Sequence, residues 1–302
     1  MPSLVLIALA GLIAQFVDGS LGMGYGLTSS TLLIAVGLSP ALASASVHLA
    51  EIGTTAVSGI AHHRFGNVDW PTVKRVAIPG AIGAFAGATF LSSISTAMAK
   101  PVAGGILFVL GVYVLLRFLI GRAPRRKPGT PGLRLLLPLG IVGGFVDATG
   151  GGGWGPVTTP TLLADGRLAP NRVIGTVNAS EFVVALAASI GFLIGLGTAG
   201  IDLGIVIALL AGGVIAAPAA AWVVRHLNAR ILGVVVGGFI CFTNARLLLG
   251  AAGASSGVTW AVYATLVAVW VASVVWVVAI VRRERRAGAV DAEPELMREA
   301  SA

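Results

Sequence analysis

The sequence predicts an all-α integral membrane protein built from two inverted repeats, and three observations support this prediction. Hydrophobic residues make up 56% of the 302 residues and charged residues only 11%, which leaves too little polar surface for a water-soluble globule. Long apolar stretches are separated by short loops that hold most of the lysine and arginine residues. A glycine-rich motif that includes an aspartate occurs twice, once in each half of the chain.

The fuller copy of this motif, FVDATGGGGWGP, spans residues 145–156, and the weaker copy, FVDGSLGMGYG, spans residues 16–26. A shift of 129 positions, from Asp18 to Asp147, aligns the two copies. The same shift also aligns the identical pairs Phe16/Phe145, Val17/Val146, Gly22/Gly151, Gly24/Gly153, Gly26/Gly155, Leu33/Leu162 and Ala35/Ala164. This agreement indicates that the chain arose by duplication.

Nine apolar segments follow one another along the chain. Their approximate bounds are 3–38, 41–61, 73–96, 101–121, 133–164, 171–197, 201–224, 230–250 and 258–281. A membrane-spanning helix needs about 20 apolar residues, so seven of these segments fit single spans. Segments 3–38 and 133–164 are longer and are interrupted by the glycine motif, so each fits either one discontinuous span or a hairpin of two half-helices.

The placement of basic residues favours the hairpins. If each motif segment leaves the membrane on the same side as it enters, all the basic loops lie on one face of the membrane, as the positive-inside rule expects. Each repeat then has an odd number of crossings, so the two halves are inverted. The expected regions are an N-terminal transmembrane repeat (1–121), a basic cytoplasmic linker (122–132), a C-terminal transmembrane repeat (133–250), an additional transmembrane helix (251–286) and a disordered cytoplasmic tail (287–302).

The motif chemistry suits an anion. Glycines allow positive φ and close backbone approach, and free amides at a half-helix N-terminus attract negative charge. The alternative is that the glycines only let helices pack closely. The candidate substrate-binding residues are the motif glycines and nearby polar side chains: Gly22, Gly24, Gly26, His48, Gly151, Gly152, Gly153, Gly155, Thr158, Thr159 and Asn178.

Four acids lie inside apolar segments: Asp18, Glu51, Asp147 and Glu181. Glu51 and Glu181 end two matching stretches, SVHLAE at 46–51 and TVNASE at 176–181. Intramembrane acids are costly and are candidates for function. Ionised, they would repel an anion, whereas protonated they can donate hydrogen bonds to it. They are therefore candidates for proton coupling or for fixing the loops, with plain helix-stapling hydrogen bonds as the alternative.

Several other classes of protein and site are disfavoured. No Gly-x-Ser-x-Gly, His-Glu-x-x-His or Gly-x-x-x-x-Gly-Lys-Ser/Thr pattern occurs, which argues against an intramembrane enzyme and an ATP-driven pump. The single cysteine, Cys241, excludes a disulfide within the chain, and no cofactor or metal is expected. The net charge of +8 lies where membrane orientation requires it, so no nucleic-acid partner is expected. The sequence does not decide whether the chain forms a homo-oligomer.

The motif residues resemble the sulfite exporter TauE/SafE family, also called the toluenesulfonate uptake permease family. The resemblance rests on the GFVD stretch at 144–147 with Gly150–Gly153, Pro160 and Leu162, and on GTVNASE at 175–181. ASVHLAE at 45–51 and RFGNVDW at 64–70 extend it to the first half. Thr31 stands where the second copy has Pro160, so the half-sites are not equivalent, and the substrate is expected nearer the second motif.

The resemblance implies a multi-pass transporter of the bacterial inner membrane for a small sulfur-containing anion, such as sulfite or an organosulfonate. Combined with the buried acids, it favours a proton-coupled secondary carrier that works by alternating access, with the C-terminus in the cytoplasm and with the anion and the lipid bilayer as partners. The alternatives are an anion channel and a carrier for a non-sulfur organic anion, with an intramembrane enzyme less favoured.

Overall fold

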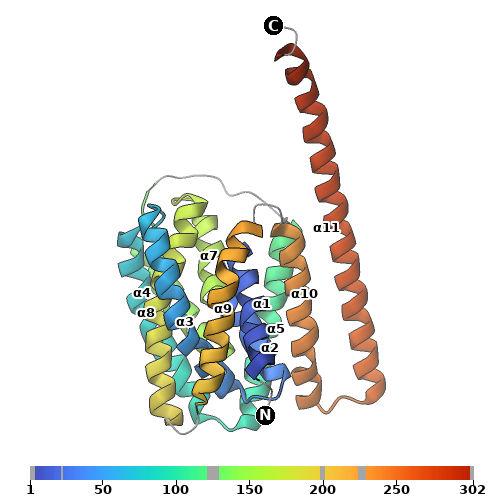
Figure 1. Cartoon of the computed structure of the whole chain (residues 1–302). Helices are drawn as coiled ribbons and strands as arrows, with labels where there is room; N and C mark the ends of the chain where they lie inside the picture. Colours follow the sequence, from blue (N-terminus) through green and yellow to red (C-terminus); the bar gives the residue numbers. More distant parts are fainter. Residues whose placement is uncertain (1–3, 22, 121–128, 198–200, 224–228, 300–302) are drawn as a thin grey trace.

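The structure is a computed structural model and describes residues 4–21, 23–120, 129–197, 201–223 and 229–299. Within these ranges the chain is all-helical, as predicted, and forms eleven helices (Figure 1). In chain order these are α1 (Leu4–Leu21), α2 (Tyr25–Ala35), α3 (Pro40–Arg64), α4 (Trp70–Ser93), α5 (Thr96–Ile120), α6 (Leu133–Gly150), α7 (Trp154–Asp165), α8 (Pro170–Leu196), α9 (Leu203–Val223), α10 (Ala229–Ala251) and α11 (Ser256–Glu299). Both long apolar segments are therefore broken at the glycine motif.

The second motif segment, α6 and α7, folds back on itself. α4 and α6 run parallel, since Gly83 lies against Ile141 and Gly87 against Phe145. α4 and α8 are also parallel, because Ser92 lies against Gly195 near their ends. α7 ends a short loop before α8 begins, so it ends on the side where α6 started (Figure 1). We call this the basic side; its charged residues include Arg64, Lys74, Arg75, Arg134, Arg167 and Arg172.

The first motif segment, α1 and α2, folds back from the opposite side. α3 runs antiparallel to α8, since Ser58 bonds to Asn178 while the rings of His48 and Phe192 lie 6.0 Å apart. α3 thus begins on the side opposite to the basic side. α2 ends on that side too, because only a short loop separates its end from the start of α3. The start of α1 lies beside Gly204 at the start of α9, which also belongs to the opposite side. The two hairpins therefore enter the bundle from opposite ends.

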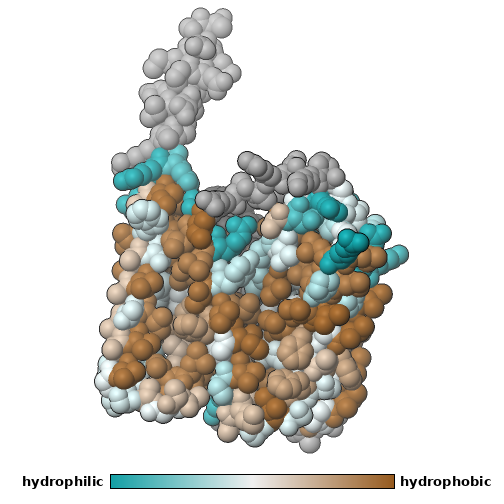
Figure 2. Space-filling model, turned by 180° about the vertical axis from the view of Figure 1, so that it is seen from behind, coloured by the Kyte–Doolittle hydropathy of each residue, from teal (hydrophilic) through white to brown (hydrophobic). Residues whose placement is uncertain are grey.

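The outer surface of the bundle is apolar. Six helical stretches in the described chain are long and apolar enough to cross a membrane: Trp70–Ser93, Thr96–Ile120, Leu133–Gly150, Arg172–Leu196, Gly233–Ala251 and Ser256–Glu284. α3 is long enough but is not among them, in keeping with its many polar residues. Hydrophilic residues gather at the basic side, and the flanks are mostly hydrophobic (Figure 2). A wide exposed apolar flank is what a bilayer-facing surface requires.

Small residues bring the helices close together. The stripe of Gly80, Gly83 and Gly87 on α4 packs within the chain. Gly83 and Gly87 lie against the α6 backbone, and Gly80 lies against Trp154 of α7. Without a hydrophobic drive between helices in lipid, such close approach supplies much of the packing energy. α4 therefore holds the second hairpin in place.

The last helix is the longest of the eleven in the described chain. α11 continues to Glu299 and so runs past the apolar stretch that ends near residue 281. Its last thirteen residues include three alanines and three glutamates, which favour a helix, but also Gly288 and Pro294, which do not. In Figure 1, α11 projects past the end of the bundle on the basic side.

Candidate functional site

The tips of the two hairpins meet inside the bundle. A Cβ atom added to Gly26 would lie 2.7 Å from the Cα of Gly152 and 2.7 Å from Oε1 of Glu51. A Cβ on Gly152 would overlap the backbone of Gly26 and Leu27. Ser30 also donates a hydrogen bond to the Gly151 carbonyl. Gly26, Gly151 and Gly152, which sequence analysis singled out, thus form one junction, where only residues without a Cβ allow the backbones to touch.

Asp147 ties the second loop tightly. Its Oδ1 accepts hydrogen bonds from the amides of Gly153 at 2.6 Å and Trp154 at 2.9 Å, and so caps α7. Its backbone carbonyl accepts from the amides of Gly151 at 2.7 Å and Gly152 at 2.9 Å. The amides of residues 151–154 are therefore all engaged by one residue in this conformation.

His48 completes the attachment of Asp147. Nε2 of His48 lies 3.0 Å from Oδ2 of Asp147, and Nδ1 lies 2.8 Å from the Ser44 carbonyl. Both ring nitrogens face acceptors, which fits a doubly protonated imidazole paired with an ionised carboxylate. Ser44 in turn donates to the Ala148 carbonyl at 2.7 Å. We call His48, Ser44 and Asp147 the clamp, because they join α3 to the tip of the second hairpin.

Asp18 holds the first loop much more loosely. Its Oδ1 lies 3.4 Å from the Tyr25 amide, at the long limit for a hydrogen bond. No other hydrogen bond to its side chain is found among the described residues. Gly24 precedes α2 with φ of 118°, a conformation that favours glycine. The matching aspartates of the two motifs therefore have different surroundings.

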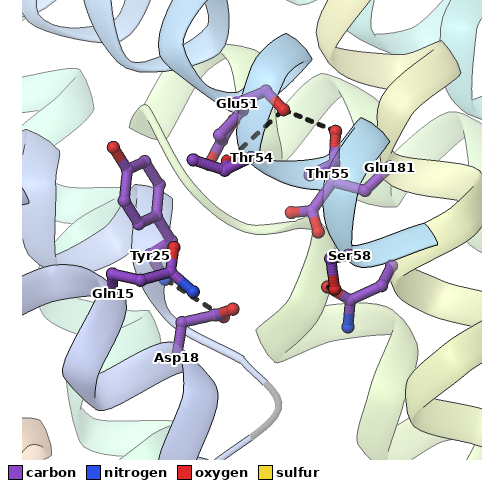
Figure 3. A pocket seen from close by; sticks show the side chains of 9 residues that line it. Gln15, Asp18, Tyr25, Glu51, Thr54, Thr55, Ser58 and Glu181 are labelled. Atoms are coloured by element: carbon purple, nitrogen blue, oxygen red, sulfur yellow. Dashed lines mark hydrogen bonds between the residues drawn. The ribbon is translucent and has the colours of Figure 1, made fainter. Parts of the chain in front are cut away.

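A narrow polar pocket lies between the first hairpin, α3 and α8 (Figure 3). It is lined by Gln15, Asp18, Tyr25, Glu51, Thr54, Thr55, Ser58, Asn178 and Glu181. None of these nine side chains is basic. Its volume is about 10 Å³, close to the minimum for one water molecule. The pocket therefore has room for no more than about one water molecule in this conformation, and we call it closed in that sense.

Most of the hydrogen-bond donors in the pocket are used by the protein itself. The hydroxyls of Thr54 and Thr55 donate to the Glu51 carbonyl, and that of Tyr25 donates to Leu209 at 3.3 Å. Ser58 donates to Oδ1 of Asn178 at 3.0 Å, and the amide of Asn178 donates to the Ile174 carbonyl.

Glu51 is the most deeply buried of the three acids that line the pocket. Only 1% of it is exposed, and neither carboxyl oxygen has a hydrogen-bond partner within the described chain. Oε2 lies 4.0 Å from Nε2 of His48, which is already directed at Asp147. A buried carboxyl group without partners costs free energy unless it is protonated or binds a ligand.

The structure thus divides the predicted site residues into groups. Asp18, Glu51, Asn178 and Glu181 line the pocket, while His48 and Asp147 form the clamp beside it. The predicted glycines lie at the junction and in the loops next to it, at positions 24, 26, 151, 152, 153 and 155. Gly22 lies outside the described residues.

The two predicted threonines of α7 are buried outside the pocket lining. Thr158 donates to the Trp154 carbonyl, and Thr159 has no hydrogen-bond partner in the described chain. Among the described residues, no group of three or more histidine, cysteine, aspartate or glutamate side chains is arranged to hold a metal ion.

Sequence analysis did not assign roles to several pocket residues. Thr54, Thr55 and Ser58 follow Glu51 at spacings of three, four and seven, which puts them on one face of α3. Gln15 lies three residues before Asp18 on α1. These side chains could have been predicted from the sequence by listing the polar residues that lie three, four or seven positions from each intramembrane acid.

Comparison with known proteins agrees with these features. The family model described as "Sulfite exporter TauE/SafE" matches residues 7–247. The Bacillus subtilis (strain 168) protein called "Probable membrane transporter protein YtnM" is 50% identical over 279 residues, which cover 92% of this chain and 93% of that protein. No solved structure matches the chain. The chain belongs to the TauE/SafE sulfite exporter family and is a multi-pass membrane transporter, not an enzyme.

Proposed function

We propose that this transporter is a proton-coupled secondary carrier that moves a small sulfur-containing anion, sulfite or an organosulfonate, across the bacterial inner membrane. The observation that carries the proposal is the closed pocket, lined by three carboxyl groups, beside the point where two broken hairpins meet. A buried site between discontinuous helices is the usual location of substrate and coupling ion in secondary carriers. The family description supplies the sulfur-containing class of substrate.

The proposed architecture is an inverted repeat, in which α1–α5 correspond to α6–α10 and α11 is added. Its support is the matching helix breaks at Leu21–Tyr25 and Gly150–Trp154, together with hairpins that enter from opposite sides. Such a pair gives each side of the membrane its own gate. In alternating access, the two repeats exchange conformations. The pocket then opens first to one side of the membrane and afterwards to the other.

The substrate lies beside the first hairpin in this proposal, and not nearer the second motif as the sequence led us to expect. The amides of residues 151–154 already bond to Asp147, so the second loop has few groups left for an anion. The first loop borders the pocket through Asp18 and Tyr25. Gly151, Gly152 and Gly153 then act by allowing the hairpins to touch.

A channel and a carrier for a non-sulfur organic anion are the remaining alternatives. The two broken hairpins that meet beside the pocket favour a carrier, because discontinuous helices of this kind frame the binding sites of secondary transporters. The decisive test is flux of sulfite into liposomes that contain the purified protein, with and without a pH gradient and with organosulfonates as competitors. Saturable, gradient-accelerated flux supports the proposal. Flux that rises linearly with concentration favours a channel.

The proposed orientation places the basic side and the C-terminus in the cytoplasm. It can be tested with single cysteines in a Cys241→Ser background and a membrane-impermeant thiol reagent applied to intact cells. Val36→Cys and Lys100→Cys, both on the opposite side, should react. Thr130→Cys, on the basic side, should react only after the cells are opened. The reverse pattern would contradict the orientation, and different reactivity at positions 36 and 100 would contradict the hairpin.

A further inference from the structure

The carboxyl groups of the pocket raise a question that the proposed function leaves open. Asp18, Glu51 and Glu181 line the pocket, and none of the nine lining residues is a lysine, arginine or histidine. Three ionised carboxylates would repel any anion in so small a volume. An anion therefore needs donors that the ionised pocket does not offer.

The donors available in the pocket can be enumerated. The hydroxyls of Tyr25, Thr54, Thr55 and Ser58 and the amide of Asn178 are directed at protein acceptors. What remains is the Gln15 amide, the second N–H of the Asn178 amide and the three carboxyl groups, which donate only when protonated. Among these three, Glu51 is 1% exposed, and neither of its oxygens has a hydrogen-bond partner among the residues that the structure describes. A carboxyl group in these surroundings is stabilised when it takes up a proton or binds a ligand.

The groups that face Glu51 come from five helices. They are Asp18 on α1, Tyr25 on α2, His48 on α3, Asp147 on α6 and Glu181 on α8. The one basic group, His48, is directed at Asp147, and the two together contribute no net charge when paired. The other charged neighbours are carboxyl groups. The surroundings of Glu51 therefore do not supply a positive charge to balance an anion.

We infer that the anion and a proton on Glu51 occupy the pocket together, so that the carrier moves both in the same direction. In this scheme Glu51 takes up a proton from the side of entry, and its O–H donates a hydrogen bond to a substrate oxygen. After the pocket opens to the other side, the anion leaves, and the proton leaves from Glu51 to the same side. The inference rests on the proposed function and adds the site of coupling and the relative direction of the two ions.

Methanesulfonate is a useful probe for this mechanism beside sulfite. Methanesulfonate is the anion of a strong acid and carries no proton at neutral pH, so any proton that moves with it must be carried by the protein. Proteoliposomes would hold a pH-sensitive dye, and each anion would be added outside without a pH gradient. We expect saturable anion entry that acidifies the interior. Protein-free liposomes control for passive diffusion.

Glu51→Gln tests the assigned residue. The amide keeps a donor of similar shape but cannot release a proton. We expect wild-type apparent affinity for methanesulfonate to fall by up to about tenfold per pH unit once Glu51 ionises, and the affinity of Glu51→Gln to stay flat. Anion entry in the variant should no longer acidify the interior. Glu284→Gln, an exposed position on α11, is the matched control and should behave as wild type.

The outcomes separate this inference from the proposed function. Saturable wild-type entry without a pH change, or with alkalinisation of the interior, would overturn the inference and leave a uniporter or an antiporter. Entry of neither anion would overturn the proposed substrate class and the inference with it. The wild-type dye signal decides between these outcomes even if Glu51→Gln does not fold.

Discussion

The two hairpins share a sequence motif but differ in how their aspartates are held. In the second hairpin, Asp147 accepts from two amides at 2.6 and 2.9 Å and pairs with His48 at 3.0 Å. In the first hairpin, the one hydrogen bond to the Asp18 side chain from the described residues comes from the Tyr25 amide at 3.4 Å, and Asp18 borders the pocket. One copy of the motif is fixed in place, and the other retains a carboxyl group that can act on a ligand.

The local sequence explains this difference. The 129-residue shift pairs Met23 with Gly152 and Leu21 with Gly150. Gly152 has φ of 150°, in the region that favours glycine, and with Gly151 it turns back so that both amides bond to the Asp147 carbonyl. A methionine does not readily adopt that backbone conformation, so the first loop cannot wrap Asp18 in the same way. The tip of the second hairpin is therefore held tightly, and the tip of the first is held more loosely.

The largest effect that we predict separates the two aspartates. Asp147→Ala leaves two buried amides and His48 without their partner, and should lower the free energy of unfolding by about 3–5 kcal/mol. Asp18→Ala loses one long hydrogen bond and should cost about 1 kcal/mol or less, while transport is lost. Denaturant titration in detergent measures the free energy of unfolding of both variants. Flux into proteoliposomes measures their transport.

Asp147→Asn controls for the loss of charge alone. Its oxygen can still accept from the amides of Gly153 and Trp154, and its amide can donate to a neutral His48. It should therefore recover much of the stability lost in Asp147→Ala. Equal destabilisation by Asp147→Ala and Asp18→Ala would show that the clamp does not distinguish the two hairpins.

A second prediction concerns the junction of the hairpins. Gly152→Ala places a methyl group against the backbone of Gly26 and Leu27 at a position of positive φ. Overpacking and backbone strain together should cost about 2–5 kcal/mol and reduce transport strongly. Gly37→Ala is the matched control, because Gly37 also has positive φ, 106°, but has no neighbour within 4 Å of an added Cβ. The Gly37→Ala variant therefore measures the cost of the backbone strain alone, which should be about 1–2 kcal/mol.

Both variants would be compared by denaturant titration and by flux. A cost for Gly152→Ala no greater than that for Gly37→Ala would mean that the hairpins do not touch at these glycines. A larger cost accompanied by normal flux would mean that the junction stabilises the fold without taking part in transport.

The sequence predicts the fold well because its signals are local. Composition identifies the membrane class, and the glycine motifs mark the breaks that separate α1 from α2 and α6 from α7. Each of these signals is read from neighbouring residues and needs no knowledge of distant contacts.

The site is less predictable because its assignments depend on distant partners. The four buried acids were found from their cost in an apolar segment. Which aspartate is held rigidly depends on His48, which is 99 residues from Asp147. The sequence pairs His48 with Asn178, yet the structure puts Asn178 in the pocket and His48 in the clamp. Equivalent positions in a duplicated chain need not keep equivalent contacts once their neighbours differ.

The smallest predicted effect concerns the wall of the pocket that faces the first hairpin. Ser58 on α3 donates to Oδ1 of Asn178 on α8 at 3.0 Å, and this bond fixes the Asn178 amide. Ser58→Ala should raise the KM for transport about fivefold, equivalent to about 1 kcal/mol, with little change in maximal rate. Ser93→Ala removes an exposed hydroxyl that bonds only within its own helix and should leave transport unchanged. Suppose instead that the KM of Ser58→Ala matches wild type while Asp18→Ala still abolishes transport. The ligand then contacts the first hairpin but not the α3–α8 wall, and the proposed binding position must be placed closer to α1 and α2.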